Sequence, residues 1–153
     1  MNSNVSQTQE SLYERDFMLW VDQTVENLQT KNVEQLDWEH LIEEVEALGK
    51  EQKNKVDSYL LQLLIHLLIY QYWQTEREWS GKGWAREIDD FRIQLELFFE
   101  STTLYNYCLQ RIKIIYEKAR KIAIRKSELS PEIFPDYCPF SVEELLDFDF
   151  FPE

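Results

Sequence analysis

One histidine lies in the middle of a long apolar segment and is the residue best placed for acid–base chemistry. The segment Tyr59–Trp73 reads YLLQLLIHLLIYQYW, with His66 near its centre. On a helix, His66 would share one stripe with Tyr59, Gln62, Tyr70 and Trp73. Imidazole can act as a general base near neutral pH, so His66 and Tyr70 are candidate catalytic residues. The alternative, which we expect, is a structural histidine whose hydrogen bonds are satisfied inside the protein.

A row of carboxylates lies earlier in the chain, in the sequence WEHLIEEVE. The spacing of Glu39, Glu43 and Glu46 places them on one stripe of a helix. Such a stripe could hold a hard metal cation with help from another helix, or it could face a basic partner. An enzyme built from these parts would use His66 with Glu43, Glu44 or Glu46. The stripe points away from the apolar residues of the same helix, so we expect it to be solvated, with Glu44 the most buried of the acids.

Charge is distributed unevenly along the chain, whose net charge is −13. Residues 1–50 carry 11 acids against 3 bases, residues 111–126 carry 7 bases against one acid, and residues 131–153 carry 7 acids and no base. The net acidity argues against binding to nucleic acid and to anionic membrane surfaces, both of which attract positive charge. We expect the bases of the run at 111–126 to pair with the acids of residues 141–153. His40 stands among the N-terminal acids and is expected to be exposed.

The composition favours a water-soluble helical protein. Only three Gly and four Pro occur in 153 residues, too few for the many turns of an all-β fold. The apolar segment falls short of the roughly 20 apolar residues that a membrane-spanning helix needs. Cys108 and Cys138 have no metal-binding spacing, and the first residues are polar without an apolar signal region. We therefore expect a cytoplasmic protein with two free thiols.

Apolar spacing and capping residues predict about five main helices and a short one near the C-terminus. The expected ranges are 12–30, 38–49, 51–77, 84–100, 101–126 and 141–147, with a loop at 80–84. One apolar face of the second helix, expected to pack on the core, comprises Trp38, Leu41, Ile42, Val45 and Leu48. The main apolar face of the third comprises Val56, Leu60, Leu63, Leu64 and Leu67. The sequence leaves open whether Gly49 separates the second helix from the third.

Several blocks of the sequence resemble one known family. They are LYERDFMLW at 12–20, LDWEHLIEEVEALGK at 36–50, HLLIYQYW at 66–73 and FPDYCPFSVEELLDFDFFPE at 134–153, together with Trp84. In these blocks the chain is similar to the DUF29 family, a bacterial family abundant in cyanobacteria whose members have no assigned function. The resemblance implies an all-helical single domain and supplies no catalytic residue. The chain departs from the family's usual pattern after HLL, where Ile69-Tyr70 stands in place of a common Lys-Trp.

We therefore predict an all-α fold, a single-domain helical bundle over residues 1–153 with about five main helices plus a short C-terminal helix. Residues 1–10 are expected to be flexible, and the proline-containing acidic segment 127–153 to dock on the bundle. The predicted function is a non-catalytic protein–protein interaction or self-association module without a cofactor. The alternative is a metal-dependent or acid–base enzyme, whose candidate metal ligands are Glu39, Glu43, Glu46 and His66.

Overall fold

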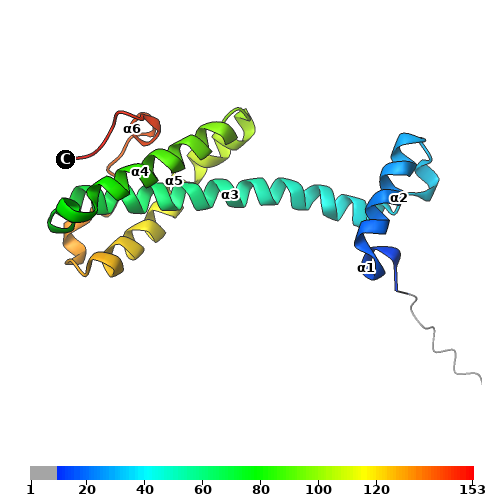
Figure 1. Ribbon diagram of the computed structural model, residues 1–153, viewed down its shortest axis with the longest axis horizontal. Coiled ribbons are helices and arrows are strands. Elements are labelled where there is room, and N and C mark those ends of the chain that lie inside the picture. The colour runs from blue at the N-terminus through cyan, green and yellow to red at the C-terminus, as the bar shows by residue number, and fades with distance from the viewer. Residues whose placement is uncertain (1–9) are drawn as a thin grey trace, which may run out of the picture. The chain divides into compact units, whose positions relative to one another are not determined.

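The computed structural model describes residues 10–153, and every regular element in that range is a helix (Figure 1). The predicted all-α fold is confirmed. Contacts between residues group the chain into two compact units, residues 1–49 and 50–153, and each unit is described by itself. The predicted flexible N-terminus, residues 1–10, lies outside the described residues except for Glu10, which is exposed.

The first unit begins with two helices where the sequence predicted one. α1 spans Leu12–Arg15 and α2 spans Phe17–Gln29, and Asp16 stands between them with φ −149° and ψ 88°. The Asp16 carboxylate accepts a hydrogen bond from the Leu19 amide over 3.1 Å and so caps α2. The continuous helix predicted over 12–30 is therefore wrong at Asp16. A short acidic side chain satisfies the free amides of a helix start better than it fits a helix interior.

A 3₁₀ turn at Val33–Gln35 leads to α3, which spans Trp38–Tyr72 without a break. Gly49 lies inside this helix, and a Cβ at that position would meet no heavy atom within 4 Å. The predicted helices 38–49 and 51–77 are therefore one element, so Gly49 does not separate them (Figure 1). An exposed glycine costs a helix about 1 kcal/mol relative to alanine, which a helix of 35 residues tolerates.

The chain turns back at Trp73, earlier than the predicted helix end at residue 77. α4, Gln74–Phe98, then runs back along α3 (Figure 1). The Trp73 backbone leaves the helical region, with φ −98° and ψ 65°, and its ring centroid lies 5.7 Å from that of Trp84 in α4. The early end of α3 thus has a packing reason, because this aromatic contact joins the two helices next to their connection.

The loop predicted at residues 80–84 is wrong, because these residues lie inside α4. Trp84 is buried in the core and fixes the register of the helix at this point. Gly81 is also buried, and a Cβ there would lie 2.9 Å from Cγ of Arg77. Gly83 faces open space, with nothing within 4 Å of a Cβ. Packing of one face of α4 overrides the low helix propensity of the two glycines, which amounts to about 1 kcal/mol at each position.

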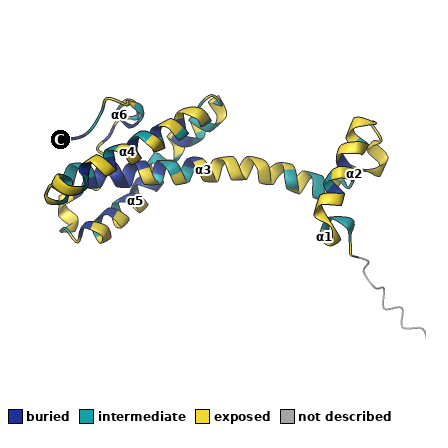
Figure 2. Cartoon of the chain, in the orientation of Figure 1, coloured by how far each residue is buried: buried dark blue, intermediate teal, exposed yellow. Residues whose placement is uncertain are grey.

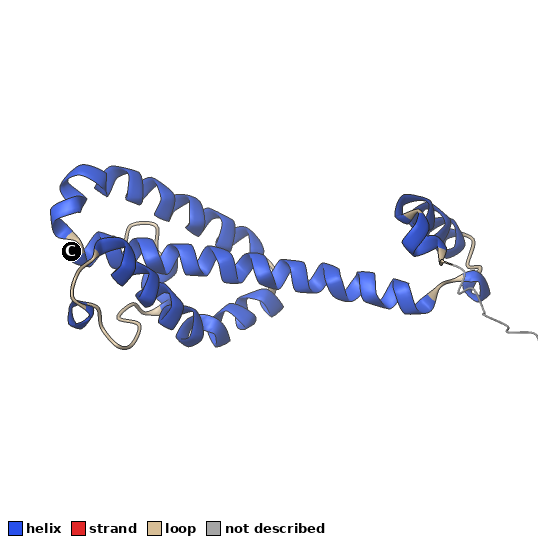
Figure 3. Cartoon of the chain, turned by 90° about the horizontal axis from the view of Figure 1, so that it is seen from below, coloured by secondary structure: helices blue, strands red, loops and turns tan. Residues whose placement is uncertain are grey.

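The core of the second unit is built around α3. α5, Thr102–Ser127, completes a set of three antiparallel helices with short connections (Figures 1 and 3). The predicted apolar face of α3 is confirmed as core, with at most 1% exposure for Val56, Leu60, Leu63, Leu64 and Leu67. Burial extends further, because every residue of α3 from 63 to 69 is buried, whichever side of the helix it occupies (Figure 2).

The C-terminal segment, residues 128–153, packs on this core. It contains a 3₁₀ turn at Pro131–Ile133 and α6, Val142–Leu146. α6 starts with a capping box, in which the side chains of Ser141 and Glu144 each accept a hydrogen bond from the other's backbone amide. The buried anchors of the segment are Phe134, Phe140 and Leu145, and Phe150 and Phe151 pack against the core beside them.

Arg92 of α4 holds the C-terminal segment by its backbone. The residue is 1% exposed. Its Nε donates to the Leu145 carbonyl over 2.8 Å, and its Nη2 donates to the Glu144 carbonyl over 3.0 Å. These carbonyls belong to the end of α6, a helix too short to satisfy them internally. The guanidinium also lies over the Phe151 ring, 5.5 Å from its centroid. One buried side chain therefore fixes both α6 and the chain beyond it.

Arg120 of α5 does the same for the turn before α6. It donates to the carbonyls of Pro131, Phe134 and Pro135, and it forms an ion pair with Asp136 at 3.5 Å. The expected pairing between the basic run and the acids of residues 141–153 is wrong for the part of the chain that the structure describes, because no ion pair joins them there. The partners of Arg120 are backbone carbonyls and Asp136 instead. Surface carboxylates keep their hydration, whereas carbonyls drawn into the protein need a donor.

We expect Gly83→Ala to raise the free energy of unfolding by about 0.5–1 kcal/mol, because alanine loses less backbone entropy in a helix and its Cβ meets no neighbour there. Gly81→Ala is the matched control, since its Cβ must displace the Arg77 side chain and the gain is reduced. Urea unfolding followed by circular dichroism measures both. A Gly83→Ala protein less stable than its parent would contradict a helix through residues 80–84.

Candidate functional site

Both ring nitrogens of His66 are engaged inside the second unit. Nδ1 lies 2.6 Å from the backbone oxygen of Gln62, one turn earlier in α3, and Nε2 lies 2.5 Å from Oε2 of Glu87 in α4. The residue is 5% exposed, and its ring centroid lies 5.2 Å from that of Phe91. A backbone carbonyl can only accept, so Nδ1 carries a proton and donates it. The contact with the Glu87 carboxyl group gives Nε2 a polar partner as well.

The geometry around His66 leaves no ring nitrogen free to contact a substrate, because each already has a partner within the protein. A general base needs a nitrogen lone pair that a substrate can reach. Here Nδ1 faces the main chain, and Nε2 lies against Glu87, whose side chain is 54% exposed. Glu87 was not predicted as a partner of His66, because the sequence does not show how α4 lies against α3. In the structure Glu87 is in α4, between the buried residues Trp84 and Ile88.

The residues predicted to share a stripe with His66 have other contacts. The guanidinium of Arg77 lies over the Tyr70 ring, 5.2 Å from the ring centroid. On the Phe151 side, the centroids of the Tyr70 and Phe151 rings are 5.7 Å apart. Gln62 contributes its backbone oxygen to His66, while the residue itself is exposed. Tyr70 thus packs against the C-terminal segment.

The predicted acidic stripe lies at the surface of the first unit. Glu39, Glu43 and Glu46 are exposed. Glu44 is half-buried and accepts a hydrogen bond from the Tyr13 hydroxyl over 2.5 Å. Among residues 10–153, no group of three or more His, Cys, Asp or Glu side chains is arranged to hold a metal ion. The carboxylates expected to act with His66 belong to the first unit, and His66 belongs to the second.

His40 is half-buried in the first unit, so its predicted exposure is wrong. Its ring stacks on Tyr13, with the centroids 4.0 Å apart and the planes 12° apart, and Nδ1 lies 2.6 Å from Oδ2 of Asp37. The hydrogen bond with Asp37 raises the pKa of His40. Burial raises the pKa of Asp37, but the hydrogen bonds from His40 outweigh it and lower that pKa overall. The hydrogen bond to Glu44 raises the pKa of Tyr13 to about 12.

The largest departure from the predicted packing is an apolar surface on the first unit. Within residues 10–49 the buried side chains are Trp20, Thr24 and Leu36. In the α3 face that was expected to pack on the core, Leu41 is half-buried and the other four residues are exposed, with Trp38 at 53% and Leu48 at 64%. We call this surface, formed by Trp38, Ile42, Val45 and Leu48, the α3 apolar face. Further exposed apolar side chains of the unit are Phe17, Met18, Leu19, Val25, Leu28 and Val33.

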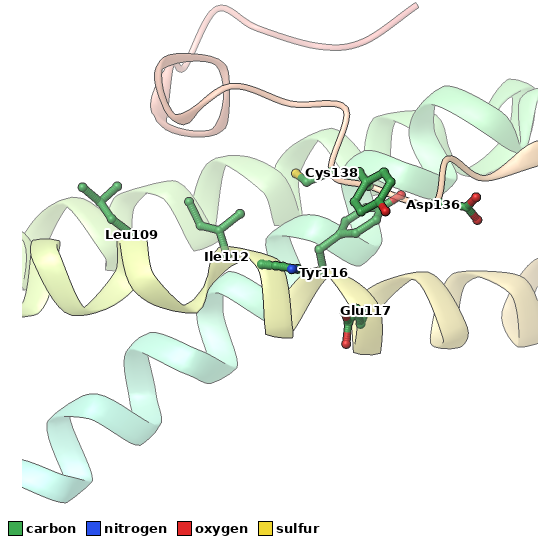
Figure 4. Close-up of a pocket in the computed structure, with 8 residues that line it drawn as sticks. Leu109, Ile112, Tyr116, Glu117, Asp136 and Cys138 are labelled. Atoms are coloured by element: carbon green, nitrogen blue, oxygen red, sulfur yellow. The ribbon is translucent and has the colours of Figure 1, made fainter.

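A hollow of about 370 Å³ lies between α5 and the turn that precedes α6 (Figure 4). Its lining residues are Leu109, Ile112, Lys113, Tyr116, Glu117, Asp136, Tyr137 and Cys138. The Tyr116 hydroxyl donates to the Pro135 carbonyl over 2.5 Å and so closes one side. Burial raises the pKa of the Cys138 thiol, which disfavours the nucleophilic thiolate. The hollow is therefore poorly suited to covalent chemistry at Cys138.

Comparison with known proteins identifies the family. The sequence profile of a family described as "Domain of unknown function DUF29" matches residues 12–151. The chain belongs to the DUF29 family. The resemblance noted in the sequence is thereby confirmed, and the match runs from the start of α1 into the C-terminal segment, so the DUF29 pattern includes both units. No curated protein and no solved structure matches the chain. Within the described part of this DUF29 chain, no helix has the length and apolar character to cross a membrane.

We expect Glu87→Ala to lower the free energy of unfolding by about 1–3 kcal/mol, because it leaves a polar nitrogen of the buried His66 without a partner. Glu87→Gln keeps an acceptor oxygen and should cost less. Glu78→Ala, at an exposed position of the same helix, is the control and should be close to neutral. Chemical unfolding measures all three. Equal stability of Glu87→Ala and Glu78→Ala would show that the His66–Glu87 contact contributes nothing.

The first unit should be most stable between the ordinary pKa values of Asp37 and His40, 3.8 and 6.5. The pKa of His40 is raised on folding, so its contribution is complete below 6.5 and is lost as pH rises through the raised value. The pKa of Asp37 is lowered, so its contribution is present above 3.8 and is lost on acidification. An NMR titration of the His40 ring should give a midpoint above 6.5, and His40→Gln should remove the alkaline loss. A midpoint at or below 6.5 refutes the pairing with Asp37.

Proposed function

We propose that this DUF29 protein is a non-catalytic interaction module whose first unit binds the apolar side of a basic partner helix. The proposal rests on the α3 apolar face. Contiguous apolar surface is uncommon on soluble monomers and, where it occurs with a polar rim, typically marks a binding site. Four large side chains on one helical stripe, each more than half exposed, make such a surface.

The spacing of the α3 apolar face suits a helical partner. Trp38, Ile42 and Val45 follow one another at intervals of four and three residues, and Leu48 comes three residues later. This is the spacing by which one helix presents a continuous seam to another. The partner would lay its own apolar stripe along the seam, as in other helix-in-groove complexes. Trp38 is the best anchor, since tryptophan is enriched among the residues that dominate binding energy.

The charge around the seam selects the partner. Residues 1–50 carry 11 acids against 3 bases, and Glu39, Glu43 and Glu46 are exposed on the same helix. A partner with lysine or arginine beside its apolar stripe would be attracted to this rim, whereas an acidic partner would be repelled. Exposed ion pairs contribute little affinity one at a time, so the acids serve selection and the apolar seam supplies most of the binding energy.

The enzyme alternative derives no support from the geometry of His66. Its nitrogens are engaged by Gln62 and Glu87 within the second unit. The acids proposed to act with it are grouped with Tyr13 and His40 in the first unit. We therefore assign the binding role to the α3 apolar face.

We expect Leu48→Lys to weaken binding of a synthetic amphipathic leucine–lysine helix by about tenfold or more, because it places a positive charge in a seam that must bind a basic helix. Leu97→Lys is the matched control, since Leu97 is similarly exposed on α4 of the second unit, at 59% against 64%. Isothermal titration calorimetry measures both affinities, and circular dichroism verifies that both variants remain folded. Equal weakening by the two variants, or binding unaffected by Leu48→Lys, would rule out the seam as the binding site.

A further inference from the structure

We infer that the partner of the α3 apolar face is the outer side of α5 in a second copy of this chain. The inference rests on the proposed function, because it names the partner of the same surface. It follows from a second exposed surface, the outer side of α5. This surface is basic, whereas the first is acidic, and it carries apolar side chains at helical spacing.

The outer side of α5 has the composition expected of that partner. Ile114 and Ile122 are 46% and 37% exposed, two turns apart on the helix. The exposed bases around them are Lys113, Lys118, Lys121, Arg125 and Lys126, with Glu117 the single acid of the run. At about 100° per residue, Ile114, Lys118, Lys121 and Arg125 fall within one narrow arc of the helix. α5 therefore has a buried apolar side and, in addition, a basic outer side that contains the two exposed isoleucines.

The ion pairs inside the chain leave this surface charged. Of the seven bases at residues 111–126, Arg111 pairs with Asp57 of α3 at 3.1 Å, and Arg120 pairs with Asp136. The other five take part in no ion pair within residues 10–153. Within the described residues, Arg120 is the one base of the run that pairs with an acid of the C-terminal segment. The basic surface is thus available to acids outside the second unit.

The two surfaces complement each other, whereas neither complements itself. The first has 11 acids against 3 bases over residues 1–50, and the second has 7 bases against one acid over residues 111–126. Two copies that met through the α3 apolar face alone would bring acid against acid, and two that met through α5 would bring base against base. Contact between unlike surfaces matches both charge and apolar residues. Such a contact is heterologous, in that each copy offers a different surface to the next.

A pair of variants with one impaired surface each tests this contact in the full chain. The first is Val45→Ser with Leu48→Ser, which removes two large apolar side chains from the α3 apolar face. The second is Ile114→Glu with Lys118→Glu, which reverses the outer side of α5. All four residues are exposed, so the fold should persist, and circular dichroism verifies it. Analytical ultracentrifugation of the parent, each variant and their equimolar mixture gives the masses.

We expect the parent to associate in a concentration-dependent manner and to dissociate as salt is raised, because surface charge attraction is screened. Each variant alone should associate about tenfold more weakly or worse, and the mixture should form a 1:1 pair, since each variant supplies the surface that the other lacks. A monomeric parent, or a mixture no larger than its components, would overturn the inference. The proposed function would survive that result if the leucine–lysine helix still required Leu48, so the two failures are distinguishable.

Discussion

A helix that is apolar on every side must be covered on every side, and this constraint organises the second unit. Each fully buried Leu or Ile of α3 between residues 63 and 69 contributes roughly 1.5–3 kcal/mol, but only if water is excluded from its own side of the helix. One neighbouring helix cannot do this. α4 and α5 therefore run back along α3, and residues Phe134, Phe140 and Leu145 of the C-terminal segment join the same core. The turn at Trp73 and the helical conformation of residues 80–84 follow, because α4 must lie close against α3 over its length.

The only polar side chain of α3 between residues 63 and 69, that of His66, has hydrogen-bond partners inside the protein. His66 donates a hydrogen bond from Nδ1 to the backbone oxygen of Gln62 in its own helix, and its Nε2 contacts the Glu87 carboxyl group, so neither nitrogen is left without a partner. The first unit faces the opposite problem. Its described part, residues 10–49, is at the size where a hydrophobic core rarely suffices alone. Its polar network of Asp37, His40, Tyr13 and Glu44 fixes the start of α3 and joins α1 to it, while most of its large apolar side chains remain at the surface.

Apolar periodicity and the scarcity of Gly and Pro were enough to predict the all-α fold, and periodicity alone predicted the buried face of α3. The errors share one physical cause, which is that local signals do not report what packs nearby. The glycines at 81 and 83 are typical of a loop, yet they lie in α4, where the core packing of Trp84 and Ile88 outweighs their low helix propensity. The stripe from Trp38 to Leu48 has the pattern of a core helix, yet no other part of its own unit covers it. Glu87 could not be matched to His66 without the register of α4. The family resemblance was clear from the sequence because it depends on residue identities rather than on packing.

The use of arginine in the second unit has a consequence for how its C-terminal segment can evolve. Arg92 and Arg120 donate hydrogen bonds to main-chain oxygens, which every residue type possesses. Side chains at the accepting positions can therefore be exchanged without loss of these hydrogen bonds, provided that the buried aromatic anchors stay. An insertion or deletion is different, because it shifts every later oxygen out of reach of its guanidinium. The segment is thus permissive in residue identity and strict in length.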